Sequence, residues 1–292
     1  MTKSLKNTVD RQYTANSIIM ASKQMRAANM VWIVVEAADD CEVYQRFMNE
    51  ANVQVRVAYD QDEHHNKSVV ILTVKSVLGA NPLVKILGIC DADYEKYCEI
   101  KNEYQNILLT DGRDLEMMLL KSDNVKRELD SWTGGKFFSV YEEVIAVCRR
   151  CGYYRIVNEI KQYSITFRNI IKLNRLWEVQ THSLRLDWKN ELDSQISSVL
   201  GNVLFCDVYK SVLEIESKLS NDSCHDICRG HDVIDSLKNA LVHTEKYNKK
   251  TIAAKIYSLY TLNCFSKTTL YSALKEYELE YNSSILMALD FN

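Results

Sequence analysis

The fold is decided by the stretch Val31-Trp32-Ile33-Val34-Val35-Glu36, a continuous apolar run that ends on an acid. A short apolar run bounded by polar chain is typical of a strand buried on both faces of a parallel sheet. The segment 42–48 follows at helical spacing, with Val43 and Phe47 on one side. The pattern therefore predicts a buried strand followed by a helix.

A second strand and helix are predicted directly downstream. Valines alternate with polar residues over 53–57, as in a half-buried strand. The polar stretch that follows, in which we expect His64 and His65 to be exposed, leads to a predicted helix over 69–78 that Gly79 closes.

Two more apolar runs, at 83–90 and 106–109, predict further strands, and a helix is predicted over 115–120. Strands that alternate with helices indicate an α/β fold with a parallel sheet and right-handed crossovers. The predicted first domain spans residues 1–130.

From about Gly134 onward the pattern changes, and apolar residues recur at helical spacing to the end of the chain. One proline and eight glycines in 292 residues leave few helix breakers. We therefore expect an all-helical domain over 135–292 that serves substrate binding, partner binding and dimerisation. The clearest predicted helices are 140–147, 194–204, 208–219 and 252–262.

Composition excludes several classes of protein. The net charge of −3 excludes a polycation that coats nucleic acid, and 47% hydrophobic residues exclude disorder. No apolar run reaches the roughly 20 residues that cross a bilayer, so we expect a cytoplasmic protein with no membrane partner. Nine cysteines are then expected to be reduced thiols.

Acidic residues follow three of the predicted strands, at the edge where open α/β sheets bind ligands. Converging carboxylates repel one another unless a divalent cation neutralises them, and oxygen ligands suit Mg²⁺ or Mn²⁺. The predicted metal ligands are Glu36, Asp40, Asp91, Asp93, Asp114 and Glu116. Metal-dependent phosphoryl transfer is the chemistry that this set favours. The alternative for any of them is a helix N-cap or a solvated loop residue, and Asp114 stands where it could cap the helix at 115–120.

These acidic segments resemble a known family. Val34-Val35-Glu36-Ala37-Ala38-Asp39-Asp40-Cys41-Glu42-Val43-Tyr44 is similar to the first motif of TOPRIM domains, and Ile86-Leu87-Gly88-Ile89-Cys90-Asp91-Ala92-Asp93 to their Asp-x-Asp motif. Leu108-Leu109-Thr110-Asp111-Gly112-Arg113-Asp114-Leu115-Glu116 resembles the stand-alone TOPRIM nucleases that serve as effectors of the two-component PARIS anti-phage systems. The resemblance covers residues 28–125, and the segment 229–235 resembles the helical half of that subgroup.

The resemblance implies roles for individual residues. Glu36 would be a metal ligand or general acid/base, and Asp91 and Asp93 would hold Mg²⁺, so these three are the predicted catalytic residues. Asp40, together with Asp114 and Glu116, would be a candidate to bind a second metal directly or to hold the ligands of that metal. TOPRIM domains usually carry glycine after the glutamate, where this chain has Ala37, and this departure leaves the geometry of the turn open.

The resemblance also implies a function and partners. It implies a toxic Mg²⁺-dependent endonuclease that cleaves host RNA, with tRNA favoured, when an ABC-type ATPase sensor subunit releases it. A homodimer is the implied active state. Two alternatives stay open: a nuclease that nicks DNA, as the overcoming-lysogenization-defect nucleases do, and a non-catalytic TOPRIM-like module that signals through its ATPase partner.

Two further patterns offer binding sites. Cys148 and Cys151, with Cys224, Cys228 and His231, could ligate zinc, although buried or surface thiols are the preferred interpretation.

Basic residues interleave with aromatic ones over 161–185, where Glu178 is the one acid. Bases among aromatics can bind phosphates and stack on nucleobases, whereas the alternative is the core stripe of an amphipathic helix with a solvated basic face. The predicted nucleic-acid-binding residues are Lys161, Arg168, Lys172 and Arg175.

Overall fold

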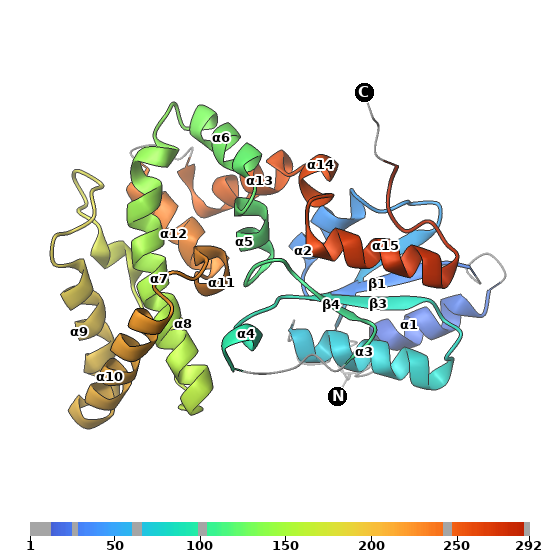
Figure 1. Ribbon diagram of the computed structural model, residues 1–292, viewed down its shortest axis with the longest axis horizontal. Coiled ribbons are helices and arrows are strands. Elements are labelled where there is room, and N and C mark those ends of the chain that lie inside the picture. The colour runs from blue at the N-terminus through green and yellow to red at the C-terminus, as the bar shows by residue number, and fades with distance from the viewer. Residues whose placement is uncertain (1–12, 25–28, 60–65, 99–103, 242–246, 289–292) are drawn as a thin grey trace, which may run out of the picture. The chain divides into compact units, whose positions relative to one another are not determined.

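The computed structural model describes residues 13–24, 29–59, 66–98, 104–241 and 247–288 (Figure 1). His64 and His65 lie outside the described residues. The chain divides into two compact units. The α/β unit comprises Met1–Asp91, Asn102–Asp111 and Thr261–Asn292, and the helical unit comprises Ala92–Lys101 and Gly112–Tyr260.

The α/β unit is built on a parallel sheet of four strands, which confirms the predicted fold class. The strands are β1 (Val31–Val35), β2 (Val53–Val57), β3 (Ile86–Cys90) and β4 (Ile107–Leu109), in the order β2-β1-β3-β4. Every residue of β1 and β3 is buried, or nearly so, because both strands are central and the sheet is covered on both faces.

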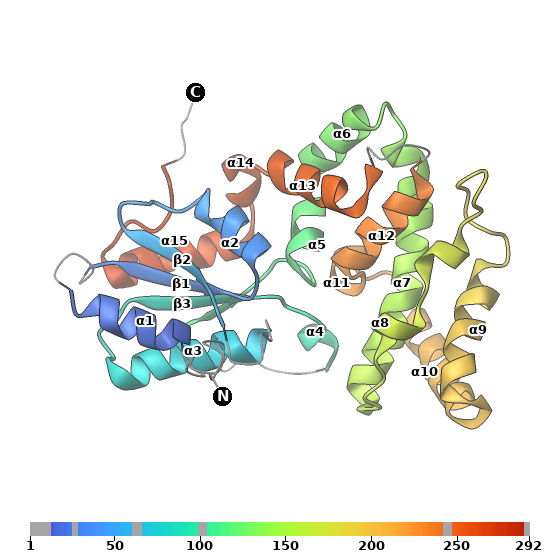
Figure 2. The same cartoon turned by 180° about the vertical axis from the view of Figure 1, so that it is seen from behind.

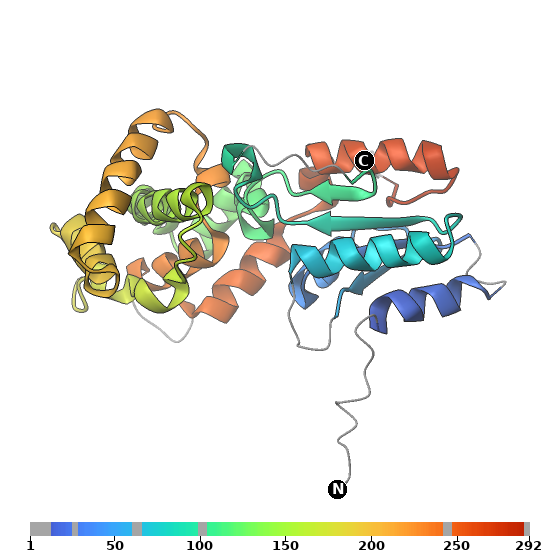
Figure 3. The ribbon, with the colours of Figure 1, turned by 90° about the horizontal axis from the view of Figure 1, so that it is seen from below.

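Helices from distant parts of the chain cover this sheet. They are α1 (Tyr13–Ser22), α2 (Ala38–Gln45), α3 (Lys67–Ala80), α14 (Leu262–Phe265) and α15 (Thr269–Tyr281). Figure 3 shows α1 and α3 on one face of the sheet and α15 on the other. On the face of α1 and α3, Ile18 and Val70 join Trp32, Val34 and Ile86 in one apolar core.

Several helix ends differ from the prediction. The predicted helix 194–204 is wrong, because Gly201 separates α9 (Trp188–Leu200) from α10 (Asn202–Lys218). Gly79 does not close α3, which continues through Ala80 to Asn81 at its C-cap. Asn81 precedes the one proline, and steric conflict with the proline ring disfavours helical geometry at that position. α2 begins at Ala38, upstream of the predicted start, because Asp40 caps its first turn.

The end of the chain belongs to the α/β unit. The carboxylate of Asp111, just after β4, accepts the backbone N–H groups of Thr269 and Leu270 at 2.6 and 2.8 Å and so caps α15. The Tyr281 hydroxyl donates to the Ile86 carbonyl at 3.0 Å. The sequence predicts one division of the chain, near 130–135, but residues 261–288 pack with the sheet. The sequence pattern did not predict this, because these contacts have no periodic signature.

The helical unit is arranged around α7 (Phe137–Lys161), and Figure 2 shows α10 and α12 alongside it. Its other helices are α4 (Glu95–Cys98), α5 (Leu115–Leu120), α6 (Asp123–Trp132), α8 (Phe167–Ile170), the 3₁₀ helix η3 (Leu173–Leu176), α9 (Trp188–Leu200), α10 (Asn202–Lys218), α11 (Cys224–Ile227), α12 (Gly230–Ala240) and α13 (Lys249–Leu259). No helix of the described ranges is both long enough and apolar enough to cross a bilayer.

Two contacts hold other helices against α7. A Cβ at Gly152 would lie 2.3 Å from the carbonyl oxygen of Ile227, so glycine permits the chain after α11 to approach α7 closely. Arg150, which is buried, donates to Glu216 at 2.5 Å and to Asp193 at 3.2 Å, and these ion pairs attach α10 and α9.

Candidate active site at the carboxyl edge of the sheet

The strand order places the predicted acids at a recognisable position. The chain runs from β1 outward to β2 and then crosses back to β3 on the other side of β1, so the order reverses between β1 and β3. Val35 is paired with Ile89 in the register of these neighbouring strands. Glu36 and Asp91 each follow their strand directly, so both lie at the switch point where open α/β sheets bind ligands.

Glu36 and Asp91 are in direct contact. The Glu36 Oε1 accepts a hydrogen bond from the backbone N–H of Asp91 at 3.0 Å, and both residues are half-buried. This bond joins the end of β1 to the end of β3 and fixes the orientation of the Glu36 carboxylate. The structure therefore brings together two of the three predicted catalytic residues.

Asp40 stabilises the turn after Glu36. Its Oδ2 accepts the backbone N–H of Ala37 at 2.9 Å, which is one half of a capping box at the start of α2. Ala37 has φ −133°, an extended conformation that any residue adopts. The turn thus has no need for the glycine that TOPRIM domains usually carry at this position.

The negative charges of these acids affect the pKa of the Cys90 thiol. Burial raises the pKa of the Cys90 thiol, the Glu36 carboxylate raises it further, and the ammonium group of Lys67 opposes the shift. Asp91 and Asp40 also raise this pKa, by smaller amounts. The three acids Glu36, Asp40 and Asp91 therefore act on one point at the carboxyl edge of β3.

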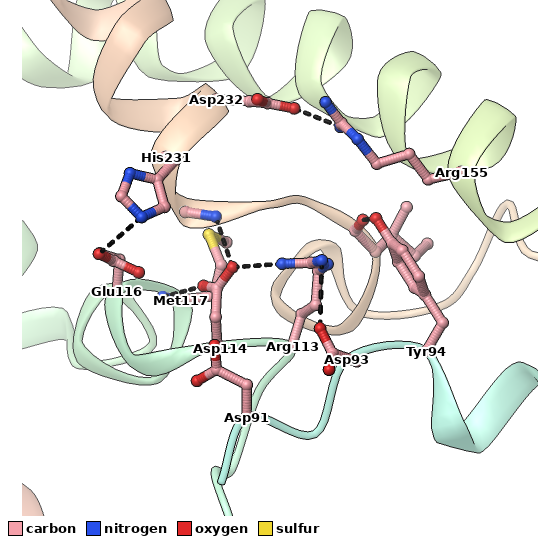
Figure 4. Close-up of polar contacts among 12 residues, drawn as sticks. Asp91, Asp93, Tyr94, Arg113, Asp114, Glu116, Met117, Arg155, His231 and Asp232 are labelled. Atoms are coloured by element: carbon pink, nitrogen blue, oxygen red, sulfur yellow. Dashed lines mark hydrogen bonds and ion pairs between the residues drawn. The ribbon is translucent and has the colours of Figure 1, made fainter. Parts of the chain in front are cut away.

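The other predicted ligands belong to the helical unit, where Arg113 binds two of them (Figure 4). The Arg113 guanidinium donates to Asp114 at 2.6 Å and to Asp93 at 3.3 Å, and it stacks on the ring of Tyr94 at 4.7 Å. The backbone N–H of Asp93 also donates to the Arg113 carbonyl, at 2.7 Å, and Asp93 has a positive φ of 48°. The side chain and the backbone carbonyl of Arg113 together therefore hold Asp93 in a tight turn.

Asp114 has the structural contacts of a helix N-cap. Its Oδ1 accepts the backbone N–H of Met117 at 3.2 Å, and its Oδ2 accepts that of Gly230 at 2.9 Å. A Cβ at Gly230 would lie 2.4 Å from the Cβ of Glu116, so only glycine permits this approach of α12 to α5. The alternative that Asp114 caps the helix at 115–120 is confirmed.

Glu116 is buried within the helical unit. Its Oε1 accepts the hydroxyl of Tyr257 at 2.8 Å and lies 4.0 Å from the His231 Nε2 (Figure 4). Burial raises the pKa of the Glu116 carboxyl, and the neighbouring Asp114 raises it further. Glu116 thus connects α5 to α13 and lies beside the start of α12.

The described residues do not form a closed metal cage. No three Asp, Glu, His or Cys side chains in the described ranges converge closely enough to hold a metal ion. Mg²⁺ needs no such cage, because it keeps several waters and is commonly bound by one or two carboxylates together with substrate phosphates. The pair Glu36 and Asp91 fits that mode of binding. It does not fit a cation enclosed by protein ligands alone.

The four cysteines considered as zinc ligands do not converge with a histidine into a metal site in the described residues. Cys148, Cys151 and Cys228 are buried, and Cys224 is partly exposed. Burial raises the pKa of the Cys148 and Cys228 thiols well above its ordinary value, which disfavours the thiolate that zinc requires. These thiols act as small apolar side chains in the part of the helical unit that the structure describes.

The four predicted nucleic-acid-binding residues are all exposed, on the chain from the end of α7 through η3. No ion pair links Lys161, Arg168, Lys172 or Arg175 to another residue of the described chain. The aromatic residues between them are buried, since Phe167 is 4% exposed and Trp177 is 3% exposed. The buried aromatic stripe and the exposed basic face are therefore confirmed, and these two rings are not available for stacking. The expected amphipathic helix is wrong, because the segment holds only the short helices α8 and η3.

Sequence reasoning missed two cations. Lys67 begins α3, directly after its N-cap Asn66, and Arg113 stands between the predicted ligands Asp93 and Asp114. Both were present in the sequence as basic residues next to predicted acidic or capping positions. The sequence thus shows that a basic residue stands next to such a position. It does not show which acids that residue lies near in the fold.

Comparisons with known proteins do not assign a function, so the proposed function is argued from this geometry. The chain matches no protein-family model, no curated protein and no solved structure. The fold class is shown by the sheet itself, and the candidate active site consists of Glu36 and Asp91 at its switch point.

Proposed function

We propose that the protein is a cytoplasmic, metal-dependent nuclease whose active site is built on Glu36 and Asp91. The observation that carries this proposal is the 3.0 Å hydrogen bond from the Asp91 backbone to the Glu36 carboxylate at the switch point of the sheet. A carboxylate oriented by the backbone of a second acid, where a parallel sheet binds ligands, is suited to metal-assisted phosphoryl transfer.

Glu36 and Asp91 would hold Mg²⁺, or Mn²⁺, together with water and a substrate phosphate. When bound, such a cation supplies Lewis-acid polarisation of the scissile phosphate. The chain itself supplies orientation, because the Asp91 N–H and the turn capped by Asp40 set the direction of the Glu36 carboxylate. Glu36 is then placed to accept a proton from the water that attacks phosphorus.

Asp93 would join this ligand set only after a rearrangement. Its carboxylate is ion-paired with Arg113 at 3.3 Å, and that cation competes with any metal for the same oxygens. We propose that the pair opens when the nuclease is active. Asp114 and Glu116, which are engaged in contacts among α5, α12 and α13, are assigned structural roles rather than a second metal.

The resemblance to TOPRIM effectors supports RNA as the substrate, with tRNA favoured, in an anti-phage response. An ABC-type ATPase sensor subunit would keep the nuclease inactive, and the released protein would act as a homodimer. Folded RNA is recognised through shape and exposed loops, and the exposed basic residues between α7 and η3 are the candidate contact surface.

Incubation of the purified chain with total tRNA, and separately with plasmid DNA, in the presence of Mg²⁺ tests the proposal. Cleavage of tRNA that stops on addition of EDTA is the expected result. Nicking of the plasmid alone would show that the substrate is DNA and would leave the proposed metal chemistry in place. If neither tRNA nor plasmid is cleaved, the nuclease is rejected.

The Arg113–Asp93 ion pair favours one second candidate, a non-catalytic module that signals through its ATPase partner. A permanent ion pair would keep Asp93 from any metal. The two candidates differ in one respect: toxicity in cells depends on Glu36 for the nuclease and is independent of it for the signalling module.

A further inference from the structure

Lys67 begins a helix whose inner face is aligned with β3. Val70 and Val74 lie against Gly88, because a Cβ at Gly88 would come 2.8 Å from Val70 Cγ1 and 3.4 Å from Val74 Cγ2. Residues 67, 70 and 74 share one face of α3. Lys67 is therefore on the side of α3 that faces the sheet, and it is half-buried there.

The direction of α3 places Lys67 at the carboxyl edge. α3 leads from the carboxyl end of β2 back to the amino end of β3, so its first turn lies at the edge where Glu36 and Asp91 meet. Lys67 is about 4.5 Å along the helix axis from Val70. Cys90 is about 6.6 Å along the strand from Gly88, so Lys67 and Cys90 reach a similar level.

Glu36 lies on the face of the sheet that α3 covers. It continues the alternation of Trp32 and Val34, both of which pack on that face. The cation and the carboxylate are thus on the same face of the sheet.

The position is unfavourable for a lysine on local grounds. A cation in the first turn opposes the helix dipole, and Asn66 already caps this end by accepting the Val69 N–H at 3.2 Å. The helix dipole and the N-cap therefore do not account for a lysine at this position.

We propose that Lys67 is a substrate-binding residue that contacts a phosphate oxygen of the RNA strand at the Glu36–Asp91 site. The inference rests on the proposed function and names the group that receives the substrate there. A lysine ammonium is a compact point charge that binds phosphate. Beside two carboxylates it offsets their repulsion of the phosphate, and it stabilises the negative charge that grows on the phosphoryl oxygens during attack.

Binding and cleavage are measured separately for Lys67→Ala, for Lys67→Arg and for the control Lys75→Ala. Lys75 is exposed on the same helix and lies over the ring of Tyr104, away from the first turn. Binding uses a fluorescein-labelled phosphorothioate RNA, followed by anisotropy at several salt concentrations. Cleavage uses total tRNA, and thermal unfolding reports on folding.

Lys67→Ala is expected to lower RNA affinity about 10-fold and to reduce the slope of log affinity against log salt by about 0.7, as for one lost phosphate contact on a single strand. Its cleavage rate falls about 100-fold. Lys67→Arg retains most of the affinity because the charge remains. Lys75→Ala binds and cleaves as the wild type does, and Lys67→Ala unfolds at the same temperature as the wild type or slightly above it.

Unchanged affinity and salt slope in Lys67→Ala, while the wild type cleaves tRNA, overturn the inference and leave the nuclease standing. Weaker binding by Lys67→Ala in a protein that cleaves nothing supports the anion site and rejects the nuclease. If Lys67→Ala only lowers the unfolding temperature, or if Lys75→Ala weakens binding equally, Lys67 has no specific role with the substrate. A wild type that neither binds nor cleaves RNA rejects both proposals.

Discussion

The carboxylate of Glu36 accepts the backbone N–H of Asp91 across the junction of β1 and β3. These residues are far apart in sequence, and the parallel register of the two central strands brings them together. The contact is specific to a sheet in which β3 lies next to β1, and it places an oriented carboxylate where the fold binds ligands.

Two glycine substitutions should have opposite effects on stability. Gly152→Ala would place a Cβ 2.3 Å from the backbone oxygen of Ile227, so we expect it to lower the free energy of unfolding by about 1–3 kcal/mol. Gly79→Ala meets no atom within 4 Å and lies inside α3, so it should raise that free energy by about 0.4–1 kcal/mol. Urea denaturation measures the free energy of unfolding of both variants. Equal changes in the two variants would mean that Ile227 does not approach Gly152 of α7 closely.

Asp114→Ala tests whether this acid is structural. The substitution removes the N-cap of α5 and leaves the partly buried Arg113 without one partner, so the free energy of unfolding should fall by about 3 kcal/mol. Asp123→Ala, at an exposed acid in the first turn of α6, should leave it unchanged within the error of the measurement. The loss should be the same in EDTA and in Mg²⁺, and a loss confined to Mg²⁺ would identify Asp114 as a metal ligand.

His225 predicts a pH dependence of stability. Burial lowers the pKa of His225 in α11, and its Nε2 lies 3.3 Å from the Leu120 carbonyl. Because the folded pKa is below the unfolded one, its contribution is present above about pH 6.5 and is lost as the pH falls further. We expect wild type to lose more stability than His225→Gln between about pH 7 and pH 5. Parallel curves for the two proteins in chemical denaturation would contradict this assignment.

Alanine at Arg168 and Arg175 together should weaken RNA binding without affecting stability. Both guanidinium groups are exposed on the helical unit. Loss of two phosphate contacts reduces the salt slope of binding by about 1.4 on a single strand. Lys136→Ala, at the opposite end of α7 from Lys161, is the matched control and should bind normally. A salt slope that stays at the wild-type value would show that RNA does not touch this surface.

The sequence predicted the local elements better than the contacts between them. The strand at 31–35 and the helix at 115–120 have the predicted bounds, because a buried apolar run and an apolar segment that follows an N-cap are signals within a few residues. The return of α15 to the sheet was missed. It depends on Asp111 and Tyr281, whose partners lie far away along the chain.

The same distinction applies to the acids. Position after a strand correctly brought Glu36 and Asp91 together, since strand ends meet at one edge of a parallel sheet. It could not separate these from Asp114, which resembles them in sequence but caps α5 and binds Arg113. The deciding partner of Asp114, Gly230, comes from a helix that no local pattern connects to α5.

The central claim is that the carboxylate of Glu36 performs chemistry on RNA. Its most direct test is the rate of tRNA cleavage in Mg²⁺ by the wild type, by Glu36→Gln and by Glu42→Gln, an exposed acid on α2 that serves as the control. We predict that Glu36→Gln lowers the rate at least about 100-fold while its unfolding is unchanged, and that Glu42→Gln cleaves as the wild type does. Cleavage by Glu36→Gln at the wild-type rate would contradict the account.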